Sequence, residues 1–154
     1  MVDRFEQFSA AMSGINQCIL KLQREEMEKY GLKGVYAQYL AILSHYPEGL
    51  TSAQMCECCD KDKAAISRTV TELENAGMLT RQCNGSNRYR AQLLLTEMGY
   101  EAAARVAERA KYAVEQAGSG LTDEQRGIFY YALGLIADNL QNICEEGLND
   151  KIDF

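Results

Sequence analysis

The sequence has little proline or histidine and no long apolar run. One of its 154 residues is proline and one is histidine. Scarce proline and stretches rich in Ala, Glu, Leu and Gln favour helix, so we expect a mainly α-helical chain. No apolar run approaches the roughly 20 residues that cross a bilayer, and the N-terminus lacks the basic and then apolar layout of a signal peptide. These absences predict a cytoplasmic protein that does not contact membranes.

Sequence motifs typical of enzymes are also missing. The sole histidine, His45, lies in no metalloprotease motif. The chain has no nucleophile elbow, phosphate-binding glycine loop or dinucleotide-binding fingerprint. We therefore predict no catalytic residue, no cofactor and no enzymatic activity.

The six cysteines leave two interpretations open. In a chain of this length with no export signal, reduced thiols are expected in place of disulfides. Three thiols, Cys56, Cys58 and Cys59, gather in the run "CECC". In the first interpretation they are functional, as metal ligands or as a redox switch. In the second they are ordinary thiols of a short helix. The second interpretation is favoured, so no metal site is predicted.

Positive charge is concentrated in one stretch of an otherwise acidic chain. The whole chain has 16 basic and 22 acidic residues, a net charge of -6. Six of the basic residues lie between positions 61 and 90, together with only three acidic ones. The basic ones are Lys61, Lys63, Arg68, Arg81, Arg88 and Arg90. An anionic partner is the natural expectation for such a stretch.

Hydrophobic periodicity divides the chain into helices and one hairpin. Apolar residues at steps of three and four, with capping residues at Thr51, Asp62 and Thr122, mark the helices. Alternation of period two on either side of "NGSN" marks two strands. The expected helices cover about residues 3–29, 34–46, 51–59, 62–76, 97–116 and 122–146, and the expected hairpin covers about residues 79–95.

Two short helices followed by a hairpin predict a winged helix-turn-helix. The expected fold class is mainly α, with a two-stranded β wing and flanking N- and C-terminal helices. We expect one domain over residues 1–154, with a DNA-binding lobe over about 34–99. Its recognition helix is residues 62–76 and its wing is residues 82–92.

The residue types on the recognition helix and wing suit double-stranded DNA. With Ile66, Val70 and Leu73 on the buried face, the opposite face is predicted to contact DNA. Its members are Lys63, Ala64, Ser67, Arg68 and Thr71, and the wing adds Arg88 and Arg90. Asp62 is assigned to capping, because its carboxylate would repel a phosphate.

The segments "LTSAQMCECCDKDKAAISRTVTELENAGMLTR" and "NRYRAQLLLTEMG" closely resemble the multiple-antibiotic-resistance regulator (MarR) family of bacterial winged-helix repressors. The matching positions are Asp62, Lys63, Ser67, Arg68, Leu73, Gly77, Arg81, Leu95, Thr96 and Gly99. Where the family's wing commonly reads Asp, Arg, Arg, this chain has Asn87, Arg88 and Tyr89. In the family's register Cys56 and Cys59 take core positions of the short helix, and only Cys58 projects outward.

The resemblance implies a homodimeric repressor that binds a pseudo-palindromic operator. Apolar faces of the helices at about 3–29 and 100–146 are then the dimerisation surfaces. Family members respond to small aromatic effectors, and Tyr36, Tyr39 and His45 are the candidate pocket residues here. The alternative is that the two tyrosines belong to the core, which is the more common place for aromatics at helical spacing. The alternatives are a helical protein-interaction module that does not bind DNA, and a regulator that senses thiol oxidation or metal.

Overall fold

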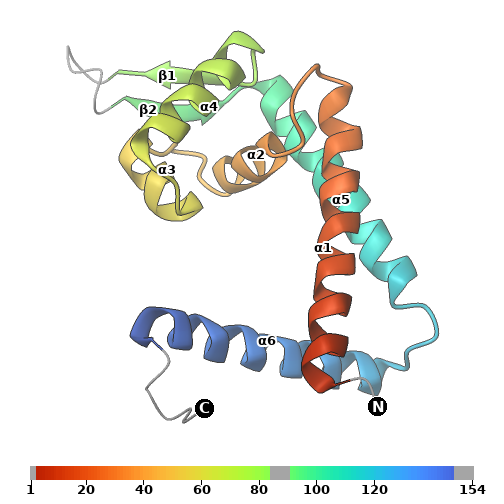
Figure 1. Ribbon diagram of the computed structural model, residues 1–154. Coiled ribbons are helices and arrows are strands. Elements are labelled where there is room, and N and C mark those ends of the chain that lie inside the picture. The colour runs from red at the N-terminus through yellow and green to blue at the C-terminus, as the bar shows by residue number, and fades with distance from the viewer. Residues whose placement is uncertain (1–2, 84–90, 148–154) are drawn as a thin grey trace. The chain divides into compact units, whose positions relative to one another are not determined.

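The computed structural model describes residues 3–83 and 91–147. These residues form two compact units, Met1–Tyr112 and Ala113–Phe154, whose boundary falls inside a helix. The helices of the first unit are α1 (Arg4–Glu28), α2 (Tyr36–Ser44), α3 (Ser52–Cys59), α4 (Lys63–Asn75) and most of α5 (Glu97–Ala117), and its strands are β1 (Leu79–Gln82) and β2 (Gln92–Leu95) (Figure 1). The second unit contains the end of α5 and all of α6 (Asp123–Glu146). The sequence-based expectation of a single domain stays a prediction.

The mainly helical fold class and the single hairpin are confirmed. Strands β1 and β2 pair antiparallel, with Leu79 opposite Leu95 and Gln82 opposite Gln92. Leu50, just before α3, adds an antiparallel bridge to Leu93 that the sequence pattern did not predict. Strand β2 is therefore paired on both of its edges, with β1 on one and with Leu50 on the other.

Local sequence explains where the helices of the lobe begin and end. Thr51 and Gln54 form a capping box at the start of α3. At the end of α4, Gly77 adopts the left-handed region, with φ of 74°. The turn between α3 and α4 contains Asp60, a non-glycine residue at φ of 49° that the sequence analysis did not foresee. Asp tolerates this conformation better than most residues because its short polar side chain bonds locally.

One hydrophobic core unites the lobe and positions α4. Leu40 and Leu43 of α2, Met55 of α3, and Leu79 and Leu93 of the hairpin are almost fully buried. Ile66, Val70 and Leu73 of α4 pack into the same core. The spacing of these three residues fixes the rotation of α4, so the opposite face of the helix is turned to solvent.

A buried carboxylate joins α1 to α5. Glu26 is 1% exposed, and its Oε1 accepts hydrogen bonds from Lys29 Nζ at 2.7 Å and from Arg109 Nη1 at 2.6 Å. Arg109 also donates to Glu25 Oε2, at 2.9 Å. The hydrogen bonds from Lys29 and Arg109 lower the pKa of Glu26 below its usual value, against the opposing effect of burial. The cluster joins α1 to α5 through Glu26 and Arg109, which are 83 residues apart in the chain.

This cluster predicts an acid-dependent loss of stability. Because the pKa of Glu26 is lowered in the folded state, its contribution is present above the unfolded pKa and is lost as pH falls through the folded one. Glu26→Gln should therefore be less stable than the native protein at pH 7, and the gap should narrow steadily below about pH 4.5. Urea denaturation across this pH range measures the gap. The control is Glu28→Gln, which changes an exposed residue of the same helix. The prediction would be contradicted if the difference in stability between Glu26→Gln and the native protein stayed constant from pH 7 to acid.

The helices near the two chain ends expose large apolar side chains. On α1 these are Phe5, Phe8, Met12, Ile15 and Ile19. Helix α6 has no buried residue, and its exposed side chains include Ile128, Leu135, Ile136, Leu140 and Ile143. Within residues 3–83 and 91–147, no helix is both long and apolar enough to span a bilayer.

Candidate nucleic-acid interface

The exposed face of α4 carries the five helix residues predicted to contact DNA. Lys63, Ala64, Ser67, Arg68 and Thr71 are all exposed. They lie on one face of the helix, opposite Ile66, Val70 and Leu73. Thr71 donates its hydroxyl proton to the Ser67 carbonyl at 2.9 Å, so its oxygen is oriented to accept a hydrogen bond from outside.

The N-terminus of α4 is capped by a side chain of the chain itself. Asp62 takes the N-cap position, and its Oδ1 accepts a hydrogen bond from the Ala65 amide at 2.7 Å. This bond satisfies one of the backbone donors that a helix start leaves unpaired. A carboxylate used in this way is held against its own helix.

Two acidic residues on α4 are held by basic partners. Glu74 accepts a hydrogen bond from Arg81 Nε at 3.0 Å, which links α4 to β1. Glu72 lies 3.6 Å from Lys33 Nζ and accepts a hydrogen bond from the Tyr36 hydroxyl. The negative charge of the basic stretch is thereby largely compensated by local partners. The sequence count correctly identified a basic excess, but it could not show that Lys33, outside the stretch, adds to it.

The wing residues predicted to contact DNA cannot be placed. Arg88 and Arg90 lie outside the described residues, so their assignment stays a prediction. The two strands that lead into and out of the wing are paired along four positions, from Leu79 opposite Leu95 to Gln82 opposite Gln92. Gln82 and Cys83, the last described residues before residue 84, are exposed.

The predicted effector residues are found in different surroundings from one another. Tyr36 and Tyr39 are 5% and 4% exposed and belong to the hydrophobic core, with their ring centroids 6.3 Å apart. His45 is exposed at the C-terminal end of α2. None of the three lines the hollow described next, so their role in effector binding stays a prediction.

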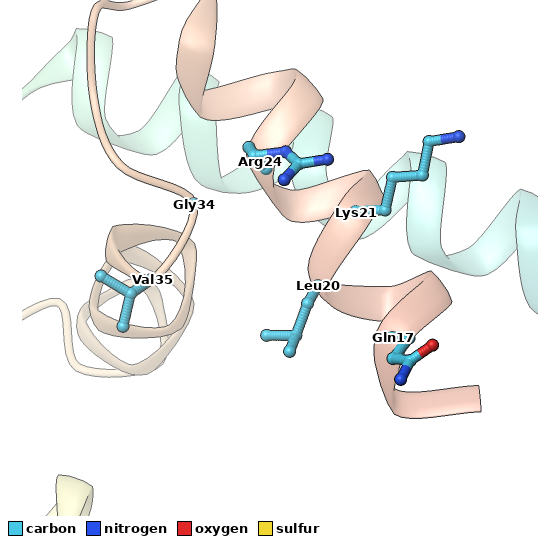
Figure 2. Close-up of a pocket in the computed structure, with 6 residues that line it drawn as sticks. All are labelled: Gln17, Leu20, Lys21, Arg24, Gly34 and Val35. Carbon is cyan, nitrogen blue, oxygen red and sulfur yellow. The ribbon is translucent and has the colours of Figure 1, made fainter. Parts of the chain in front are cut away.

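A hollow of about 330 Å³ lies between α1 and the segment before α2. Its lining residues are Gln17, Leu20, Lys21, Arg24, Gly34 and Val35. Leu20 points from α1 into the gap toward the segment that carries Val35, whereas Lys21 projects to the other side of the helix (Figure 2). The volume is at the lower end of the range for sites that bind small molecules.

The thiols of α3 differ in exposure. Cys58 is exposed, Cys56 is half-buried and Cys59 is buried. Burial raises the pKa of the Cys59 thiol, so it stays protonated and weakly nucleophilic at neutral pH. No group of three His, Cys, Asp or Glu side chains suited to a metal ion occurs in the part of the chain that the structure describes.

Part of the chain is similar in sequence to a known family of proteins. Residues 30–88, from the end of α1 to the wing, match the sequence model described as the MarR family. This part of the chain is similar to the MarR family. A protein of Thauera aromatica named for transcriptional regulation of the hcr operon is 28% identical over 94 residues, which are 61% of this chain and 55% of that protein. The match thus spans about half the length of that relative.

Solved MarR-family structures share the fold along most of the chain. A MarR transcriptional regulator from Methanosarcina mazei has a TM-score of 0.75 and 22% identity, covering 93% of this chain and 94% of its own. A MarR-family regulator from Listeria monocytogenes was solved with a 26mer DNA. It has a TM-score of 0.72 and 18% identity, and the match covers 98% of this chain and 99% of the Listeria chain. Both of these structures are described as transcriptional regulators, and the family model matched by residues 30–88 is not that of an enzyme family.

Three features of this site were not found from the sequence. They are the Tyr36 to Glu72 bond, the Lys33 to Glu72 pair and the Arg81 to Glu74 pair. The first two join residues more than 35 positions apart, and neither helical periodicity nor a motif relates such positions. Only Arg81 and Glu74, separated by a helix end and a single turn, offered a signal in the form of neighbouring opposite charges.

Proposed function

We propose that the protein is a dimeric transcriptional regulator, a repressor, that binds double-stranded DNA through α4 and the wing. The observation that carries the proposal is the exposed face of α4. It presents Lys63, Ser67 and Arg68 together on a helix whose other face is fixed in the core. A helix of this kind fits the major groove, where Arg and Lys pair with guanine edges or phosphates and Ser with either.

The local charge supports DNA as the partner. The pairs of Glu74 with Arg81 and of Glu72 with Lys33, together with the cap at Asp62, hold all three acidic residues of the basic stretch in contacts with their own chain. Positive charge can then act on phosphates with little local opposition. The related Listeria protein was solved with DNA, which adds support from the same fold.

The exposed apolar side chains of α1 and of α6 support the proposed dimerisation. Side chains such as Phe5, Ile15, Ile128 and Ile143 are 41–72% exposed, and exposed apolar residues in this number are typical of protein interfaces. A second copy of the chain covers each set in our proposal. A two-fold dimer then presents two recognition helices to a pseudo-palindromic operator in the cytoplasm.

Release by a small effector completes the proposal. The hollow lined by Leu20, Arg24 and Val35 supports it, because it combines apolar walls with cationic side chains at the edge of the lobe. A small aromatic effector, bound there or near Tyr36, Tyr39 and His45, favours a conformation with lower affinity for DNA. Such a ligand acts only through its different affinity for the two conformations.

A gel-shift titration tests the function directly. Purified protein under reducing conditions is titrated against the intergenic DNA upstream of its own gene and against a scrambled duplex, each at two salt concentrations. We expect preferential binding of the native duplex that weakens steeply with salt, since phosphate contacts release counterions. Light scattering of the same preparation should give twice the 17.2 kDa of one chain.

Three outcomes would each contradict a part of the proposal. Absence of binding to either duplex at low salt would favour the helical protein-interaction module. A molar mass of 17.2 kDa at micromolar concentration would refute the dimer. Equal binding of both duplexes would leave DNA binding intact and refute its sequence preference.

A further inference from the structure

Tyr36, the first residue of α2, is hydrogen-bonded to a residue in the last turn of α4. The Tyr36 hydroxyl donates to Glu72 Oε2, and Lys33 Nζ lies 3.6 Å from the same oxygen. Lys33 also lies over the Tyr36 ring, 5.9 Å from its centroid. The three side chains form a small cluster at the rim of the core, which we call the Glu72 clamp.

Glu72 is a potential competitor for the DNA contact of Arg68. It follows Arg68 by four positions on α4, and both residues are exposed. Opposite charges at this spacing attract each other on a helix surface. In the structure the carboxylate is instead engaged by Tyr36 and Lys33, and the effect of Arg68 on the pKa of Glu72 is smaller than theirs.

The Tyr36 hydroxyl is a stable and well-positioned hydrogen-bond donor in the clamp. Tyr36 is 5% exposed, and burial together with Glu72 raises the pKa of its hydroxyl to about 12. The hydroxyl therefore keeps its proton and remains a donor at physiological pH. Gly34 holds the preceding segment close to α1, because a Cβ there would come within 2.8 Å of the Arg24 Cα. The donor is thus positioned by the core and by α1 before any DNA arrives.

We propose that Tyr36, assisted by Lys33, is a positioning residue that holds the Glu72 carboxylate away from Arg68 and so keeps the Arg68 guanidinium available to DNA. The inference rests on the DNA-binding function proposed above. Without the clamp, Glu72 pairs with Arg68 and occupies its guanidinium, and Lys33 no longer offsets the Glu72 charge near the phosphates. Both effects weaken DNA binding, and both require the charge of Glu72.

A double-mutant cycle tests the proposal. Binding of the native protein, Tyr36→Phe, Glu72→Gln and the combined variant to the upstream duplex is measured by fluorescence anisotropy. We expect Tyr36→Phe to raise Kd by about three- to tenfold, as one ion pair and one added charge at each half-site would produce. The combined variant should return to within about twofold of Glu72→Gln, since the charge that harms binding is gone.

The cycle separates positioning from simple structural damage. Tyr30→Phe, at a partly buried tyrosine that packs against the same core, is the matched control and should bind as the native protein does. Equal weakening of Tyr36→Phe with and without Glu72→Gln would overturn the proposal, and so would an unchanged Kd for Tyr36→Phe. If the native protein binds neither the upstream nor the scrambled duplex, the proposed function itself fails, which is a different result.

A second variant keeps the test valid if Tyr36→Phe does not fold. Thermal unfolding of each variant establishes this point. Lys33→Gln changes a side chain that is 71% exposed, so it leaves the core intact. We expect a smaller rise in Kd for Lys33→Gln, which Glu72→Gln should again abolish. A rise that persists in the combined variant would show that Lys33 acts on DNA directly and would overturn its role in the clamp.

Discussion

Gly99→Ala should destabilise the protein by about 3 kcal/mol. This is the upper end of the usual cost of overpacking, and we expect it because the added methyl group would clash with rigid backbone. A Cβ at position 99 would lie 2.0 Å from the Met78 carbonyl oxygen and 3.1 Å from Leu95 Cδ2. The Met78 carbonyl cannot yield easily, since it accepts the Thr96 amide at 3.0 Å. Urea denaturation of the two proteins measures the loss.

The surroundings of Gly99 explain why no small shift relieves the clash. Thr96 Oγ1 donates to the Gly77 carbonyl at 2.6 Å and accepts the Gly99 amide at 3.1 Å. The end of α4, the start of β1 and the first turn of α5 therefore meet at one point. As a control, Gly127→Ala in α6 meets no atom within 4 Å and should stabilise its helix by about 0.5–1 kcal/mol. Equal stabilities for native protein and Gly99→Ala would contradict the close contact.

Arg68→Ala should weaken binding to the upstream duplex by about 1–3 kcal/mol, or roughly 5- to 150-fold, if Arg68 pairs with a base edge. Arg68 is the exposed guanidinium on α4, and a planar fork of donors matches the two acceptors of guanine. The scrambled duplex should lose less affinity. Anisotropy titrations of both duplexes at one salt concentration measure the difference.

The control for Arg68→Ala removes the same charge elsewhere. Arg105 is an exposed arginine of α5 that pairs with Glu101 at 3.1 Å, so Arg105→Ala changes the net charge without touching α4. It should alter Kd by less than about twofold, as expected for a charge far from the phosphates at physiological salt. Losses of equal size on the upstream and scrambled duplexes for Arg68→Ala would show that Arg68 contacts only phosphate.

The elements of the lobe could be predicted because their signals are local. Thr51 with Gln54 and Thr122 with Gln125 form the two capping boxes expected from their spacing. The rotation of α4 also follows from three apolar residues at helical spacing. Where a structure depends on a few neighbouring residues, the sequence is a sufficient guide.

The features that could not be predicted depend on residues distant in sequence, or on a residue spacing that is common to more than one kind of site. Glu26 and Arg109 show no relation along the chain, yet they form the hydrogen bond that links α1 to α5. Tyr36 and Tyr39 are candidates for an effector pocket by sequence, but their helical spacing is more common in a core, where both rings are found. Periodicity identifies the side of a helix that is covered and does not identify what covers it.

Helix α6 has a consequence for how the protein responds to dilution. None of its residues from Asp123 to Glu146 is buried, although it carries many large apolar side chains. In proteins, most of the stability of a helix comes from packing its apolar face against other parts of the structure. In the proposed dimer, the stability of α6 is therefore coupled by mass action to the second copy that covers it, and chain concentration affects folding as well as assembly. A cell that makes little of this protein would then hold part of it with α6 loosened, so abundance itself would set how much of the protein is fully folded.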